Sequence, residues 1–362
     1  DNASDGIYAD KNCDELKIVE CYISGNSDGI RINSQRSKIY PEILRDTIIS
    51  NRNNGIYLYS YYDNSYKKYY EGPVATIQGN VIYGNGEYQL NLGRYDDNND
   101  IWINAEGNWW GSAEPKEINE YIYDHHNAVS RAYVDFVPFL DSEGGNEITG
   151  NYKIGPITQD ETWSSHVVVV GDIYVQDDYT LSIMSGVQVS MSEKTGILVT
   201  DGHLQVNGSV GEEVAFNSYL SEPSPGDWRS IEFTGKTPGS QSQMDHFVIE
   251  HSTDGLKFTS NNASSVISNG RIRNFSSNGI YLSNSNPSIE NIDMVNTGEH
   301  HLTGTGYKIV NNSGSTITGG KVQKCDYGIS IVNASPELKG LTIIDNASDG
   351  IYADKNCDEL KI

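Results

Sequence analysis

Cysteine is scarce in this chain, and its spacing excludes two common ways of stabilising a protein. Only four cysteines occur among 362 residues. Cys13 and Cys357 occupy the same position in two copies of one stretch, so the repeating unit holds three cysteines. An odd, sparse set is unlike a disulfide framework, and there is no CxxC pair of the kind that binds zinc. Pairing between Cys13 and Cys21 stays open.

The chain also lacks long apolar runs and has few basic residues. No apolar run approaches the roughly 20 residues that a membrane-spanning helix needs. Lys and Arg number 25 against 49 Asp and Glu, which gives a formal net charge of −24. A surface this acidic argues against nucleic acid and anionic membranes as partners. It fits an extracellular or cation-binding surface, although acidity also serves solubility alone.

One stretch of eighteen residues occurs twice. Residues 1–18 and 345–362 both read DNASDGIYADKNCDELKI, with a constant offset of 344 (345 − 1). The match includes polar positions such as Lys11 and Glu15, which a shared fold alone would not require. The repetition predicts that the chain is a window on a tandem array with a 344-residue period. An engineered permutation would produce the same overlap.

A shorter repeat runs through most of the chain. A glycine preceded by Asp or Asn begins a run of alternating apolar residues, as in Gly29-Ile-Arg-Ile and Gly279-Ile-Tyr-Leu. Within each half of the chain most of these glycines recur every 22 to 27 residues, which is the length of a solenoid coil. Alternation with period two predicts strands with one buried face, and Asx-Gly allows the sharp corner between strands. With two further short strands per coil, the pattern predicts an all-β fold, a parallel β-helix.

The coils resemble the right-handed parallel β-helix repeats of the pectate-lyase-like superfamily, and more closely the tandem-repeat surface proteins of archaea and bacteria. Residues 156–234, with VVVVGDIYV and PGDWRSIEFTG, resemble the N-terminal entry coils of such domains. Residues 104–140, with NAEGNWWGSAEP, resemble their closing segment. The resemblance implies the right-handed fold. It implies no single activity, because the superfamily includes lyases, hydrolases, epimerases and inert scaffolds.

The closing segment precedes the entry segment, which the 344-residue period explains. Residues 1–140 are then expected to be the C-terminal half of one β-helix repeat domain. Residues 141–155, which are polar and rich in glycine, are expected to be a linker. Residues 156–362 are expected to be the N-terminal part of the next domain.

The outward position two residues after each glycine forms a candidate contact surface. Stacked at coil spacing, these residues would place aromatic and basic groups in one stripe, suited to sugar rings and uronate carboxylates or to another subunit. The same pattern would arise if long side chains on exposed strands only covered one another. The expected column is Lys257, Tyr281, Lys308, Ser330, Tyr352 (the copy of Tyr8), Arg31 and Tyr57, extended at its ends by Glu232, Gln89 and Trp102 from similar strands that start without the glycine.

Two insertions add further candidates. The tyrosine-rich stretch 57–71, with Tyr61 and Tyr62, would offer a contact loop, since tyrosine buries area at low entropic cost. A loop folded back on its own coil is the alternative. The cluster Asp96, Asp97 and Asp100 offers carboxylates of the kind that bind Ca²⁺, although it lacks EF-hand spacing and a solvated turn has the same composition.

No catalytic constellation emerges from the sequence. A uronate lyase needs a Ca²⁺-binding Asp cluster facing a basic residue, and Arg31, Arg271 and Arg273 qualify only by residue type. We therefore expect a non-enzyme: a secreted or cell-surface building block of a fibre, sheath or surface layer, with copies of itself as partners. The alternative is an extracellular β-helix protein that binds or cleaves polysaccharide. No cofactor other than Ca²⁺ is suggested.

Overall fold

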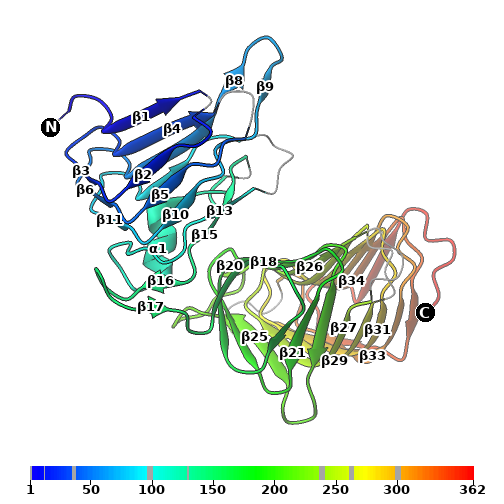
Figure 1. Cartoon of the computed structure of the whole chain (residues 1–362). Helices are drawn as coiled ribbons and strands as arrows, with labels where there is room; N and C mark the ends of the chain where they lie inside the picture. The colour runs from blue at the N-terminus through cyan, green and yellow to red at the C-terminus, as the bar shows by residue number, and fades with distance from the viewer. Residues whose placement is uncertain are drawn as a thin grey trace. The chain divides into compact units, whose positions relative to one another are not determined.

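The computed structural model describes residues 2–11, 13–34, 38–95, 101–128, 130–235, 241–260, 265–297 and 303–362. The chain divides into two compact units, Asp1–Gly155 (unit 1) and Pro156–Ile362 (unit 2). Each unit is a stack of parallel β coils (Figure 1). The predicted parallel β-helix is therefore confirmed.

Unit 1 has three parallel sheets, one for each side of the coil. The first contains β1 (Ile7–Asp10), β4 (Ile30–Ser34), β7 (Ile56–Ser60), β12 (Leu90–Leu92) and β14 (Ile122–Tyr123). The second contains β2 (Lys17–Val19), β5 (Glu42–Leu44), β10 (Thr76–Gln78), β13 (Trp102–Asn104) and β15 (Tyr133–Asp135). The third contains β3 (Tyr22–Ser24), β6 (Thr47–Ile49) and β11 (Val81–Tyr83).

Three shorter features interrupt or follow these coils. The tyrosine-rich insertion forms an antiparallel hairpin of β8 (Tyr62–Asp63) and β9 (Lys68–Tyr69) that projects from the coils (Figure 1). Helix α1 (Pro115–Tyr121) begins at a proline and buries Ile118. β16 (Phe139–Leu140) pairs with β17 (Glu147–Ile148). Among the described residues, no helix has the length and apolar character to cross a membrane.

Unit 2 is a continuous 20-stranded sheet, β18 to β37, wound into coils. One side contains β20 (Val167–Val175), β23 (Ile197–Val199), β26 (Ile231–Thr234), β28 (Asp254–Thr259), β30 (Asn278–Ser283), β32 (Thr305–Val310), β34 (Tyr327–Val332) and β37 (Ile351–Asp354). The remaining strands are β18 (Tyr152–Ile157), β19 (Glu161–Trp163), β21 (Thr180–Met184), β22 (Gln188–Met191), β24 (His203–Asn207), β25 (Val214–Ser218), β27 (Gln243–Glu250), β29 (Val266–Arg273), β31 (Ser288–Val295), β33 (Thr316–Gln323), β35 (Glu337–Lys339) and β36 (Thr342–Ile344).

The apolar alternation read from the sequence fills the interior of the coils. Ile231, Leu256 and Ile280 lie in register on successive strands and are fully buried. Phe233 and Phe258 stack with their ring centroids 4.5 Å apart. Each such side chain contributes roughly 1.5–3 kcal/mol through burial, and only against its neighbouring coils.

Long strands of unit 2 bend at residues that tolerate a left-handed backbone. β29 and β31 bend at Asn269 (φ 52°) and Asn291 (φ 53°), and β33 bends at Gly319 (φ 67°). Asparagine and glycine adopt the left-handed backbone conformation with less steric strain than other residues. Their presence at the bends explains why one strand can line two sides of a coil.

The residues expected to form a linker, 141–155, include β17 and the first part of β18. That stretch therefore carries strand structure. The assignment of residues 1–140 and 156–362 to two neighbouring repeats stays a prediction. All four cysteines, including Cys13 and Cys21, are free thiols in the structure.

Candidate functional site

The outward column is in register in both units. In unit 1, Tyr8 lies opposite Arg31, and Arg31 lies opposite Tyr57. In unit 2, the column runs through Leu198, Glu232, Lys257, Tyr281, Lys308, Ser330 and Tyr352. The expected alignment is thus observed from Tyr8 to Tyr57 and from Glu232 to Tyr352, and the structure adds Leu198 to the column. The role of these residues in contact stays a prediction.

Two expected members of the column lie elsewhere. Asn91, and not Gln89, lies opposite Tyr57, whereas the Gln89 side chain is buried and accepts a hydrogen bond from Asn85 Nδ2 at 2.7 Å. Trp102 belongs to β13 in the second sheet. Its ring stacks on Tyr133 with centroids 4.6 Å apart. The placement of Gln89 and Trp102 in the column is therefore wrong, because both were placed from strands without the glycine that fixes the position along the coil.

Arg31 is the centre of an aromatic cluster on unit 1. Its guanidinium carbon lies 5.6 Å from the ring centroid of Tyr8, 5.4 Å from that of Tyr57 and 5.1 Å from that of Tyr59. Tyr57 and Tyr59 stack with centroids 5.0 Å apart, and Arg31 lies 3.9 Å from an Asp5 carboxylate oxygen. The cluster offers ring faces and a planar cation to a ligand.

The environment of Tyr8 also raises its pKa, to about 12. The hydrogen bond to the Tyr59 hydroxyl is the largest cause, followed by burial of the phenol. The two hydroxyl oxygens lie 3.5 Å apart. Because the ring is 55% exposed, it remains accessible to a partner.

The hairpin β8–β9 contains the other predicted contact residues, Tyr61 and Tyr62. Tyr62 is exposed and lies opposite Tyr69, with ring centroids 4.9 Å apart. The buried Asp63 stabilises the hairpin turn. Its Oδ1 accepts hydrogen bonds from the backbone N–H of Ser65 at 2.8 Å and from that of Tyr66 at 3.2 Å. The insertion is therefore an ordered, projecting element.

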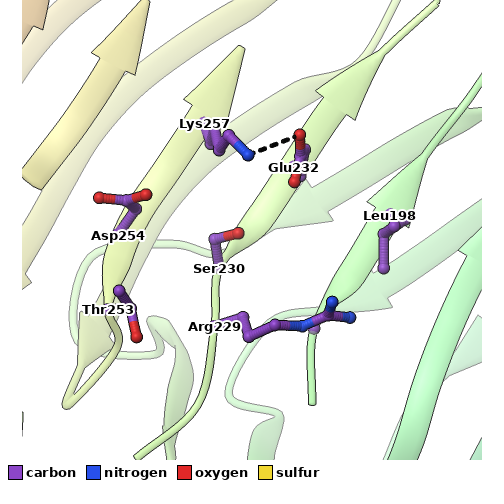
Figure 2. A pocket seen from close by; sticks show the side chains of 8 residues that line it. Leu198, Arg229, Ser230, Glu232, Thr253, Asp254 and Lys257 are labelled. Atoms are coloured by element: carbon purple, nitrogen blue, oxygen red, sulfur yellow. Dashed lines mark ion pairs between the residues drawn. The ribbon is translucent and has the colours of Figure 1, made fainter. Parts of the chain in front are cut away.

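A shallow groove of about 210 Å³ lies on unit 2, a feature that the sequence alone did not indicate (Figure 2). Two of its lining residues form an ion pair, with Lys257 Nζ 3.0 Å from Glu232 Oε1. Arg229 is paired with the buried carboxylate of Asp172, which also accepts the Gly196 N–H at 2.9 Å. The groove is lined by Gly196, Leu198, Arg229, Ser230, Glu232, Thr253, Asp254 and Lys257.

The groove presents paired charges to a polar ligand. Asp254 Oδ1 accepts two hydrogen bonds from Asn278, at 3.0 Å from the backbone and 2.7 Å from the side chain. Only Glu232 and Lys257 could have been found from the sequence, through the column. Asp172 and Arg229 are 57 residues apart, and no repeat pattern links them.

The predicted metal ligands and the basic catalytic candidates are the remaining residues singled out from the sequence. Asp96, Asp97 and Asp100 lie outside the described residues. Within the described ranges, no group of three or more His, Cys, Asp and Glu side chains is arranged to hold a metal ion. Arg271 lies 3.0 Å from Glu213, and Arg273 lies 3.8 Å from Glu250.

Comparison with known proteins supports the fold. No curated protein matches the chain. Residues 237–362, which lie in unit 2, match the family model described as the right-handed β-helix region. Together with the parallel coils, this match identifies the fold as a right-handed parallel β-helix.

Proposed function

We propose that this chain is a structural building block of an extracellular fibre, sheath or surface layer made of tandem β-helix repeats. The observation that carries the proposal is the eighteen-residue stretch found at both 1–18 and 345–362. Each copy forms a strand of a parallel coil, β1 and β37, and both place the same tyrosine, Tyr8 and Tyr352, in an outward column. If all copies of a repeat fold alike, a single type of interface is enough to stack each copy on the next.

The physics of the fold favours assembly. The last coil of a parallel stack leaves backbone N–H and C=O groups unpaired along its edge, and such edges pair readily with another chain. Linking repeats in tandem would bring the edges together at high effective concentration. The net charge of −24 suits a solvated extracellular surface.

The test is electron microscopy of the purified 362-residue chain, together with an assay on uronate polymers. We expect rod-like filaments or end-to-end oligomers and no degradation of the polymer. Monomers at every concentration, or cleavage of a uronate polymer, would contradict the proposal.

Polysaccharide binding is the second candidate, and the Arg31 cluster is the observation that favours it. Stacked tyrosine rings beside a guanidinium suit sugar faces and uronate carboxylates. A glycan array would favour this function if the parent chain binds and Tyr57→Ala abolishes binding. Tyr22→Ala is the matched control, because Tyr22 is 72% exposed but lies in the third sheet of unit 1.

A further inference from the structure

The groove on unit 2 lies within the stack of coils and away from its first and last coil. Its lining side chains come from β23, β26 and β28 and from the residues directly before these strands (Figure 2). β20 pairs with β23 on one side, and β30 pairs with β28 on the other. The coils thus continue past the groove in both directions, so its form does not depend on where the chain begins or ends.

Small residues leave room for the groove between longer side chains. Gly196 and Ser230 directly precede Ile197 and Ile231, which lie opposite each other on neighbouring strands. A Cβ on Gly196 would lie 3.0 Å from Ser230 O and 3.6 Å from Arg229 Nε, so a larger side chain would fill this space. The volume of about 210 Å³ is below the roughly 300–1,000 Å³ of sites for drug-sized ligands. The groove therefore suits one small ring.

The charges that line the groove balance one another. Two cations, Arg229 and Lys257, face two anions, Glu232 and Asp254, for a formal sum of zero (2 − 2). Lys257 pairs with Glu232, and Arg229 pairs with Asp172, a carboxylate that is 2% exposed. An ionic ligand would have to compete with these pairs for a partner of opposite charge, whereas a hydroxyl group would not.

The paired ions can still form hydrogen bonds with hydroxyl groups. An ammonium has three N–H donors, and a carboxylate has about four acceptor sites. Glu232 engages one donor of Lys257, and Asn278 engages two acceptor sites of Asp254. The groove therefore keeps donors and acceptors for a ligand, and Leu198 adds an apolar contact.

We propose that this groove binds one ring of a neutral sugar. Such a ring combines hydroxyls that both donate and accept with apolar C–H faces, which matches a charge-balanced polar lining beside Leu198. A uronate would add a carboxylate next to Glu232 and Asp254, and an existing ion pair would have to open to receive it. The site is separate from the Arg31 cluster of unit 1 and does not rest on the proposed structural role.

The experiment is saturation-transfer-difference NMR of the 362-residue chain with the methyl glycosides of glucose, galactose and mannose. Galacturonate is the anionic comparison, and titration of each binding probe gives its dissociation constant. We expect at least one neutral glycoside to bind, and galacturonate to bind about tenfold more weakly or less. Failure of all three neutral probes to bind, or tighter binding of galacturonate, would overturn the proposal.

A double variant locates the binding. Lys257→Met with Glu232→Gln removes an ion pair without leaving an unpaired charge. We expect it to weaken binding of the neutral glycoside by about tenfold or more, because hydrogen bonds to charged groups are the stronger ones. Lys308→Met is the matched control, since Lys308 lies in the same column but donates to Ser330 Oγ at 3.0 Å.

Circular dichroism melts check that the double variant and Lys308→Met fold like the parent. Equal affinity in the double variant and the control would place the sugar elsewhere and refute the site. Filaments of a chain that binds no neutral sugar would refute this inference while leaving the proposed function standing.

Discussion

At the scale of single residues, Asp135 carries a pH dependence that can be tested. Burial raises the pKa of its carboxyl to about 7, the nearby Glu106 adds to the rise, and the hydrogen bond from the Val137 N–H opposes it. The folded state therefore holds a proton that the unfolded chain, with a pKa near about 3.9, has already released. The stability that this proton contributes is present at low pH and is lost as the pH rises to about 7.

Asp135→Asn should remove this loss, because the amide stays neutral and can still accept the Val137 N–H. We expect the variant to be more stable than the parent at about pH 8 by roughly 1–3 kcal/mol, and similar to it near about pH 4. Urea denaturation at the two pH values measures the difference. Asp141→Asn is the control, since Asp141 is exposed and its pKa is lowered by the Ser142 hydroxyl. Equal pH dependence in the parent and Asp135→Asn would refute the argument.

The alignment of single residues can be predicted from the sequence where each coil carries the glycine that starts its strand. Tyr8, Arg31 and Tyr57 were aligned by counting from their glycines, and the structure aligns them in the same way. Trp102 is misplaced because its strand lacks that glycine and belongs to the second sheet. Tyr59 was missed as a member of the Arg31 cluster, although its place two residues after Tyr57 in β7 would have put it on the same face.

At the scale of elements, the coils of unit 1 are joined by a buried asparagine ladder. Asn51 Oδ1 accepts from the backbone N–H of Asn26 at 3.1 Å and from its side chain at 3.0 Å. Asn51 Nδ2 donates to Asn85 Oδ1 at 2.9 Å, which continues the ladder to the next coil. A buried polar group that loses its partner costs free energy, so each member of the ladder depends on the others.

Asn51→Ala should lower the free energy of unfolding by roughly 2–4 kcal/mol, because it leaves the backbone N–H of Asn26 without its acceptor and removes one of the two donors to Asn85 Oδ1. Asn53→Ala should cost less than about 1 kcal/mol, since Asn53 makes a part-buried hydrogen bond to Ser27 Oγ at 3.0 Å. Urea denaturation followed by circular dichroism compares the two. A similar loss in both variants would show that the ladder has no special role.

The strands could be predicted from the local sequence, unlike the asparagine ladder, which links separate coils. Alternation such as Ile-Tyr-Leu fixes a strand and its buried face locally, within a few residues. The hairpin β8–β9 and helix α1 escaped prediction, because a tyrosine-rich stretch and a seven-residue helix carry no clear period. The Asp172–Arg229 pair depends on coils that are adjacent only after folding.

At the scale of the whole molecule, charge and stacking oppose each other. The chain carries 49 acidic and 25 basic side chains, so two copies repel at a distance. Coil–coil pairing acts only at contact, through hydrogen bonds and buried apolar rows. Repulsion between acidic chains should therefore control how readily the ends meet, while the edges determine which surfaces bind.

Salt should consequently strengthen end-to-end association. Raising NaCl from about 0.01 M to about 1 M shortens the screening length from about 30 Å to about 3 Å, which removes most of the long-range repulsion. We expect the association constant of the chain to rise by about tenfold or more across this range. Sedimentation equilibrium measures the association constant at each salt concentration. Association that requires Ca²⁺ at fixed ionic strength and ignores NaCl would contradict screening as the cause. It would point instead to a bound cation, for which Asp96, Asp97 and Asp100 are the candidate ligands by composition.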